Sequence, residues 1–234
     1  MDCFDLPPEP AIVALPKHSL LIRSADSESH RQDATQLIKQ MYAWRGYGSD
    51  FVMDEDPGRM TFLATDYRAG NAVGTLTVAL DRGPSGLLAD RLYHAEAERL
   101  RRDGRRLCEM IKFAGRRGVA CKETLAALFH MAFIYAYHLH GCTDLLIEVT
   151  PQHASFYAQM LHFQPLGEEK LNPRVNTRGV LLSLSLAHCA AQIALWGGKG
   201  NRSKDRSLYP YAFSQAQEAV IRERIEADQV LLAA

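Results

Sequence analysis

The stretch from Arg105 to His140 constrains the fold more than any other part of the sequence. Its first apolar run has the length of a strand, and a side-chain period of two places Glu109 on the same face as Leu107 and Ile111. Burying a carboxylate is costly unless the group has a partner or a task. The run therefore predicts a core strand that carries an acid with a specific role.

A loop with glycines and arginines follows this strand, and a long helix comes after the loop. The loop contains Gly115, Arg116, Arg117 and Gly118, and the helix is expected from Lys122 to His140. The first amides of a helix are unpaired donors, and beside basic side chains they suit a phosphate group. A solvated loop is the alternative. We favour the phosphate interpretation because helix N-termini usually carry acidic residues.

The rest of the chain alternates between strand and helix patterns. An extended arm is expected over residues 1–19, because prolines stand at positions 7, 8, 10 and 16. Periodicity and turn signals predict strands at 20–22, 60–67, 72–81, 107–113, 144–150 and 181–186. They predict helices at 33–45, 90–103, 122–140 and 152–162. A C-terminal helix is expected after Ser214 and Gln217, which have the spacing of a capping box. This order favours a mixed sheet covered by helices, in a single domain over residues 20–234 that ends in a helical extension from about residue 190.

The charges balance, with 27 basic and 27 acidic residues. We expect no nucleic-acid partner, because any basic site has to be local, as in the cluster from Arg99 to Arg106. That cluster is either a solvated helix end or a docking patch for an acidic carrier. No apolar run reaches the roughly 18 residues that cross a bilayer, so we expect no transmembrane segment and leave peripheral contact with a membrane open.

Cysteines and histidines show neither a disulfide nor a metal pattern. The five cysteines form no CxxC pair, and a reducing cytoplasm fits their use. His130, His138 and His140 do not share one helix face. We therefore expect a cytoplasmic protein without a metal site.

Two segments sharpen the interpretation. The run GTLTVALD at 74–81, followed by GLLADRLYHAEAERLRRDGRRLCEMIKFAG at 86–115, resembles the long-chain N-acyl amino acid synthases of the FeeM type. These are acyltransferases of the GNAT fold and relatives of the acyl-homoserine lactone synthases. The resemblance covers roughly residues 20–186, includes IEVTPQHASFYAQMLHF at 147–163, and extends to the closing segment at 207–225. It implies an α/β (α+β) fold, GNAT-like, with a mixed, mostly antiparallel central sheet flanked by helices.

The resemblance also implies a reaction. An acyl group passes from a phosphopantetheine thioester, on acyl carrier protein or as acyl-CoA, to the amino group of an amino acid, and no cofactor is bound permanently. The pantetheine arm inserts between two strands that splay apart, here taken as Gly74–Asp81 and Leu107–Phe113. The residues implied on the donor side are Met110, Ile111, Lys112, Arg116, Arg117, Gly118 and Lys122, and those implied on the substrate side include Leu76 and Asp81.

The loop at 116–120 matches the usual pyrophosphate motif of acetyl-CoA enzymes only loosely, which shifts the expected donor from free CoA toward carrier protein. Acyl-homoserine lactone synthase and another GNAT N-acetyltransferase are the alternative enzymes. A catalytically silent module that binds an acyl ligand is the alternative outside enzymes.

The chemistry needs a base, because an amine at neutral pH is mostly an ammonium ion. Glu109 is the candidate, since desolvation raises a carboxyl pKa toward a useful range. A structural ion pair with Arg105 or Arg106 is the alternative. Backbone amides near Met110 to Lys112 are candidates to bind the oxyanion. Tyr157 is the candidate proton donor to the leaving thiolate, and Arg45 or Arg82 is the candidate partner of the amino acid's carboxylate, because a guanidinium binds that group in a bidentate manner.

Overall fold

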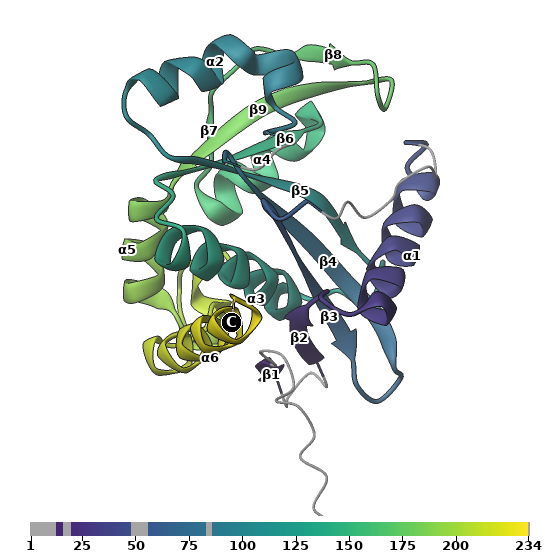
Figure 1. Ribbon diagram of the computed structural model, residues 1–234, viewed down its shortest axis with the longest axis vertical. Coiled ribbons are helices and arrows are strands. Elements are labelled where there is room, and N and C mark those ends of the chain that lie inside the picture. Colours follow the sequence, from purple (N-terminus) through teal and green to yellow (C-terminus); the bar gives the residue numbers. More distant parts are fainter. Residues whose placement is uncertain (1–12, 16–19, 48–55, 83–85, 234) are drawn as a thin grey trace, which may run out of the picture.

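The computed structural model describes residues 13–15, 20–47, 56–82 and 86–233, and one large sheet forms its centre (Figure 1). Within these ranges the strands pair in the order β1-β2-β3-β4-β5-β6-β9-β7, and β8 is attached to β9. Neighbours are antiparallel except for β5 and β6, which are parallel. The strands are β1 (Val13–Leu15), β2 (Leu20–Ser24), β3 (Arg59–Asp66), β4 (Asn71–Leu80), β5 (Leu107–Gly115), β6 (Asp144–Val149), β7 (Gln164–Pro165), β8 (Lys170–Asn172) and β9 (Thr177–Ser185). The expected mixed, mostly antiparallel sheet is confirmed.

Helices cover both faces of the sheet (Figure 1). They are α1 (Glu28–Trp44), α2 (Asp90–Arg102), α3 (Lys122–Phe133), α4 (Pro151–Leu161), α5 (Leu186–Trp196) and α6 (Gln215–Ala233), with the π-helical turn η2 (Ile134–Leu139) and the short 3₁₀ turns η3 (Gly200–Arg202) and η4 (Tyr209–Tyr211). Residues of α3, α4, α5 and α6 share the main core with one face of the sheet. Residues of α2 and α1 form two smaller clusters with other strand residues, on the opposite face.

Most predicted elements are present, with shifted boundaries. Helix α1 begins at Glu28, five residues before the predicted start, because Ser27 caps it: its hydroxyl accepts a hydrogen bond from the His30 N–H at 3.2 Å. The predicted helix over 122–140 ends in the π-helical turn η2. Strands β7 and β8 have no counterpart in the prediction, and α5 begins at Leu186, shortly before the helical extension expected from about residue 190. Of the predicted N-terminal arm, residues 1–12 and 16–19 lie outside the described residues, and β1 pairs with β2.

The cleft between strands does not lie where we expected it. Strands β4 and β5 pair from Leu80 and Cys108 to Gly74 and Gly115, with one irregularity between. Strands β5 and β6 pair only up to Glu109, and then separate. The prediction of a cleft between Gly74–Asp81 and Leu107–Phe113 is therefore wrong, because parallel β5 and β6 are the strands that diverge.

An irregularity in β5 accompanies this divergence. The register between β4 and β5 shifts beside Thr75–Thr77, and Lys112 on the facing strand has φ of 51°. A lysine rarely adopts this left-handed conformation, which occurs in β-bulges. A bulge bends its strand, so β5 is bent at the point where it has already left β6.

The C-terminal segment packs onto the main core. The Tyr209 hydroxyl donates to the Leu161 carbonyl at 2.7 Å, and Leu208, Phe213 and Ile221 belong to the core cluster. The predicted capping box is confirmed, since the Ser214 N–H donates to the Gln217 side-chain carbonyl at 3.0 Å and the Gln217 N–H donates back to the Ser214 hydroxyl at 3.4 Å.

His130 and His138 also take part in this packing. The His130 Nδ1 atom accepts from the Phe213 N–H at 2.9 Å, so its Nε2–H donates to Glu218, also at 2.9 Å. His138 contacts the same carboxylate at 2.8 Å. These contacts join α6 to α3 and η2. Among the described residues no group of three or more His, Cys, Asp or Glu side chains is placed to hold a metal ion.

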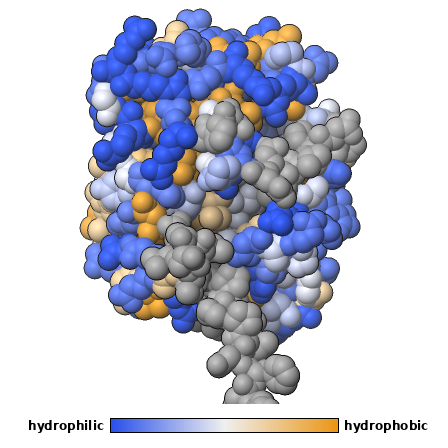
Figure 2. All heavy atoms as spheres, in the orientation of Figure 1, coloured by the Kyte–Doolittle hydropathy of each residue, from blue (hydrophilic) through white to orange (hydrophobic). Residues whose placement is uncertain are grey.

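Figure 2 shows that the coloured residues on this face are mostly hydrophilic, with hydrophobic residues in small separate groups. No helix within the described ranges is both long enough and apolar enough to cross a bilayer.

Candidate active site

A cavity of about 370 Å³ lies where β5 and β6 separate. Its walls come from the end of α1, from β5, β6 and α4, and from the β8–β9 hairpin. The residues on the main-core side of the sheet are mostly apolar, namely Met110, Phe113, Leu125, Ile147, Phe156 and Tyr157. The remaining wall carries polar and charged side chains, including Glu109, Glu148, Thr150, Asn172, Arg174 and Thr177. The cavity therefore offers an apolar region beside a charged one, which suits an acyl donor next to a polar acceptor.

Glu109 lies in the wall of this cavity and is 1% exposed. Its Oε2 atom accepts a hydrogen bond from the Ala89 N–H at 3.1 Å, just before α2 begins. Arg105 instead lies 3.6 Å from the Asp144 carboxylate, and Arg106 donates to the Gly141 carbonyl. The alternative in which Glu109 forms a structural ion pair with Arg105 or Arg106 is therefore wrong.

Burial is the main influence on the acidity of Glu109. Its pKa is raised to about 7, chiefly by desolvation and also by the charges of Glu148 and Asp90, while hydrogen bonds from the amides of Ala89 and Leu88 oppose the shift. A carboxyl group with a pKa near 7 exchanges its proton readily at neutral pH. Its burial in the cavity wall and its raised pKa make Glu109 a candidate general base.

Tyr157 lies in the opposite, apolar wall and is 7% exposed. Its ring packs edge-on against Phe129, Phe156 and Phe163. Burial raises the pKa of its hydroxyl well above the ordinary value, although the charge of Arg45 lowers it. The hydroxyl therefore stays protonated at neutral pH and can donate a proton.

The donor-side residues divide into two groups. Met110, Ile111 and Lys112 line the cavity, beyond the last pair that β5 forms with β6. The loop residues Arg116, Arg117, Gly118 and Lys122 are not part of the cavity wall.

The basic side chains of this loop have other neighbours. The Arg116 guanidinium donates to the Ala72 carbonyl at 3.1 Å, and that of Arg117 lies 4.2 Å from the centre of the Trp44 ring. The Lys122 ammonium lies 5.6 Å from the Tyr211 ring. Of these neighbours, Trp44 adjoins Arg45 of the cavity wall, so Arg117 lies close to the cavity without lining it.

The substrate-side predictions also divide. Arg45 lines the cavity, whereas Leu76 is fully buried in the main core. Asp81 forms an ion pair with Arg101 at 2.6 Å, and Arg82 contacts the His140 ring. Of the two arginines considered for the carboxylate, the structure brings only Arg45 into the cavity. The placement of Leu76, Asp81 and Arg82 contradicts a role in its wall, because β4 is separated from the cleft by β5.

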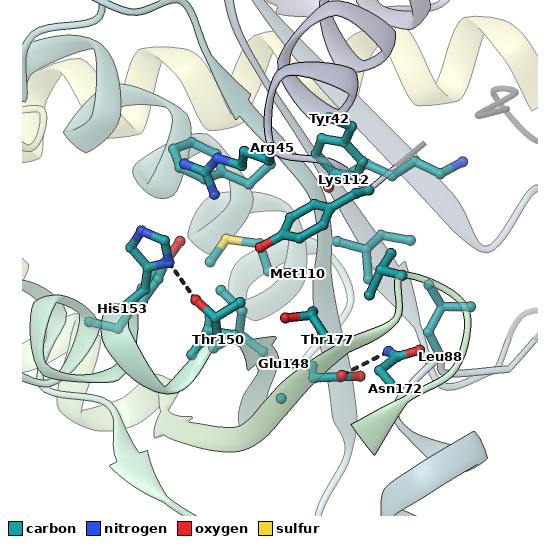
Figure 3. Close-up of a pocket in the computed structure, with 18 of the residues that line it drawn as sticks. Tyr42, Arg45, Leu88, Met110, Lys112, Glu148, Thr150, His153, Asn172 and Thr177 are labelled. Atoms are coloured by element: carbon teal, nitrogen blue, oxygen red, sulfur yellow. Dashed lines mark hydrogen bonds between the residues drawn. The ribbon is translucent and has the colours of Figure 1, made fainter. Parts of the chain in front are cut away.

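Several polar residues that line the cavity were not predicted from the sequence. Figure 3 shows Arg45 and Tyr42 on one side, with Glu148, Asn172 and Thr177 facing them. Glu148 could have been found by the argument that identified Glu109, because it is a carboxylate within a strand of branched apolar residues. Asn172 and Thr177 come from a hairpin that has no sequence pattern of comparable strength.

Comparison with known proteins gives one family match and several structures with a similar fold. The family model for the N-acyl amino acid synthase FeeM matches residues 33–185. The solved structure of FeeM, an N-acyl amino acid synthase from uncultured soil microbes, is similar with a TM-score of 0.64 and 26% identity, over 74% of this chain and 93% of that one. Among functionally curated proteins no sequence gives a significant match.

Two further structures share the fold alone. A GCN5-related N-acetyltransferase from Brucella melitensis has a TM-score of 0.53 at 11% identity, over 87% of this chain and 95% of that one. A putative N-acetyltransferase from Lactobacillus plantarum has a TM-score of 0.50 at 16% identity, over 71% and 98% of the two chains. The family match spans well over half of the chain and includes every strand from β3 to β9. The chain therefore belongs to the FeeM family of N-acyl amino acid synthases, which are acyltransferases with the GNAT fold.

Proposed function

We propose that this protein transfers a long-chain acyl group from the phosphopantetheine arm of acyl carrier protein to the amino group of an amino acid. Glu109 is the general base, Tyr157 is the proton donor to the thiolate, and Arg45 binds the carboxylate of the acceptor. The observation that carries the proposal is the cavity at the β5–β6 divergence, which has Glu109 in its polar wall and Tyr157 in its apolar wall.

The acceptor enters as an ammonium ion, which has no lone pair with which to attack. Glu109 takes one proton from it. The amine nitrogen then attacks the thioester carbonyl carbon, so that a C–N bond forms while the C–S bond breaks and its electron pair leaves on sulfur. Tyr157 gives its proton to this thiolate and regains one, through solvent, from the nitrogen. The products are an amide, a thiol and one proton released by Glu109.

Backbone amides complete the site. The main chain of Met110 to Lys112 continues beyond the last pair with β6, so its edge faces the cavity rather than a neighbouring strand. Amides in this position are suited to bind the developing oxyanion, and one such donor typically contributes about 3 kcal/mol to transition-state stabilisation.

The loop before α3 supports carrier protein as the donor. The Arg116 guanidinium binds the Ala72 carbonyl, and Arg117 stacks on Trp44. These two cations are held against the protein, which is not the arrangement of a loop that wraps the pyrophosphate of free CoA. Arg117 is exposed beside Trp44, which adjoins Arg45 of the cavity wall, and there it suits the single phosphate and the acidic surface of a carrier protein.

The same proposal includes one domain and a cytoplasmic location. The core residues of α5, η4 and α6 belong to the cluster that also contains β2 to β6, which supports a single folding unit over residues 20–234. The cytoplasmic location rests on the sequence, whose five cysteines form no CxxC pair.

A transfer assay tests this function. The purified protein is incubated with a pool of the common amino acids and, in parallel, with palmitoyl carrier protein or palmitoyl-CoA, and the products are identified by mass. We expect an N-palmitoyl amino acid, formed with the larger kcat/KM from the carrier. A lactone, acetyl transfer alone, or unchanged thioester beside tight acyl binding would each contradict the proposal and support one of the three alternatives.

A further inference from the structure

Glu148 is a second carboxylate in the wall of the cavity, on the strand that diverges from that of Glu109. Glu109 pairs in register with Leu146, and Glu148 follows two residues later, so both carboxylates project from the same face of the sheet. They are close enough for the charge of Glu148 to raise the pKa of Glu109. Two like charges close together in a partly buried site disfavour each other's ionisation, and either a proton or a bound cation relieves the repulsion.

No basic side chain in the described part of the chain forms an ion pair with either carboxylate. Two basic residues of the adjacent hairpin pair with other carboxylates, whereas Arg174 of the same hairpin lines the cavity. Lys170 is paired with Glu96 at 2.9 Å, and Arg178 with Glu169 at 3.1 Å. An ammonium group bound between the two carboxylates would relieve this repulsion while both are ionised.

Glu148 is also held in place. The Asn172 amide donates to its Oε1 atom at 2.8 Å (Figure 3), and the orientation of that amide is fixed because the Asn172 carbonyl oxygen accepts from the Arg174 N–H at 3.0 Å. The side chain also lies against Gly179, where a Cβ atom would collide with Oε1. The backbone there is fixed in turn, since the Tyr93 hydroxyl donates to the Gly179 carbonyl at 2.7 Å. Elements α2, β8 and β9 thus position one carboxylate at the cavity wall.

We propose that Glu148 binds the ammonium group of the acceptor amino acid and holds it beside Glu109. The assignment rests on the proposed function and extends it: Glu148 recognises the cation, and Glu109 then removes its proton. Arg45 lies on the facing side of the cavity (Figure 3), so the charges of the wall are complementary to a zwitterion. Glu148 is a positioning residue for the amine, and its contribution is specific to acceptors that carry a positive charge.

The test measures preference for the amine. Calorimetry compares L-phenylalanine with 3-phenylpropanoate, and L-leucine with 4-methylpentanoate, for the wild type, Glu148→Gln and the control Glu169→Gln. The glutamine carbonyl oxygen of Glu148→Gln can still accept the hydrogen bond from Asn172. Glu169 serves as the control because it is an exposed carboxylate next to the β8–β9 hairpin. We expect the wild type and the control to prefer at least one amino acid over its analogue by about tenfold or more, and Glu148→Gln to lose that preference.

The outcomes separate the two proposals. Equal loss of affinity for amine and analogue would indicate a structural role, and an unchanged preference in Glu148→Gln, or no preference in the wild type, would also overturn the assignment. If the wild type prefers the amine through Glu148 but transfers no acyl group in the mass assay, the proposed reaction fails and this assignment stands. If acyl transfer occurs and the preference does not depend on Glu148, the reaction stands and this assignment fails.

Discussion

The Oε2 atom of Glu109, in the middle of the sheet, accepts a hydrogen bond from the Ala89 N–H, at the start of α2, at 3.1 Å. This contact joins the strand that borders the cavity to the helix on the opposite face from α3. One oxygen is thereby fixed by the backbone while the carboxyl group remains in the wall of the cavity. The hydrogen bond orients the buried carboxyl group without placing a positive charge beside it.

The first prediction concerns Glu109→Gln, which keeps the size of the side chain and its ability to accept from Ala89. We expect kcat to fall about 10²- to 10⁴-fold, the usual contribution of a positioned general base. Circular dichroism and steady-state kinetics check fold and rate together, with Glu223→Gln on the exposed side of α6 as the control. Wild-type turnover in a normally folded Glu109→Gln protein would show that another group is the base.

The second prediction concerns pH and rate. Since burial raises the pKa of Glu109 to about 7, the base is ionised only above that pH, and kcat/KM should rise with pH through about 7 before it levels. The measurement is kcat/KM from pH 5 to 8.5, with an acyl donor at fixed concentration. An acidic limb below pH 5 would exclude Glu109 as the titrating group.

The same pKa shift affects stability with a defined sign. In the folded protein Glu109 keeps its proton up to about pH 7, whereas the unfolded chain loses it near the ordinary pKa of 4.5. Its stabilising contribution is full below the unfolded pKa and is lost as the pH rises through the folded one. The free energy of unfolding of the wild type, relative to Glu109→Gln, should therefore fall by about 3 kcal/mol between these two pKa values and stay constant above them. Urea unfolding at several pH values measures it, and a relative stability that rises with pH would contradict the shift.

A further prediction concerns the backbone at Lys112, where φ is 51°. Glycine adopts this conformation without the steric cost that a Cβ atom introduces, so Lys112→Gly should be more stable than Lys112→Ala by about 1 kcal/mol. Comparing glycine with alanine removes the effect of losing the lysine side chain. At Lys39, inside α1, the order should reverse, because glycine is the poorer helix former. Urea unfolding of the four variants decides, and equal stability of the Lys112 pair would argue against strain at this residue.

Gly179→Ala tests the support of Glu148. An added Cβ atom would collide with the Glu148 carboxylate and displace it. We expect the KM for the amino acid to rise, as in Glu148→Gln, while the KM for the acyl donor stays constant. In a double-mutant cycle Gly179→Ala should have little additional effect once Glu148 is replaced by glutamine. Additive effects would mean that the glycine acts independently of this carboxylate.

Arg45 and Arg82 form a matched pair for the carboxylate of the acceptor. Arg45 lines the cavity, whereas Arg82 contacts His140 outside it. We expect Arg45→Gln to raise the KM for the amino acid about tenfold, the loss of a charged hydrogen bond, and Arg82→Gln to leave it unchanged. The reverse pattern, measured by initial rates at saturating donor, would assign the carboxylate to Arg82.

The sequence by itself determined the elements that depend on local periodicity and capping. Strand β5 with Glu109 on its buried face, the β3–β4 hairpin, helix α2 and the capping box before α6 all follow from patterns within a few residues of one another. The resemblance to the FeeM type rests on the same local segments, and the family match confirms it.

Only the tertiary structure decided which strands separate and which residues meet at the cavity. The cleft lies between β5 and β6, because their parallel pairing ends at Glu109. Strand β4 stays paired with β5, so Leu76 in that strand, and Asp81 and Arg82 directly after it, lie outside the cavity wall. Glu148 and Glu109 line the same cavity although they lie nearly forty positions apart in the chain. Asn172 and Gly179, from a later hairpin, both contact Glu148. Periodicity predicts the face on which a side chain lies, but the partner of that face is set by strand order and register. These depend on packing between distant segments, which leaves no local pattern in the sequence.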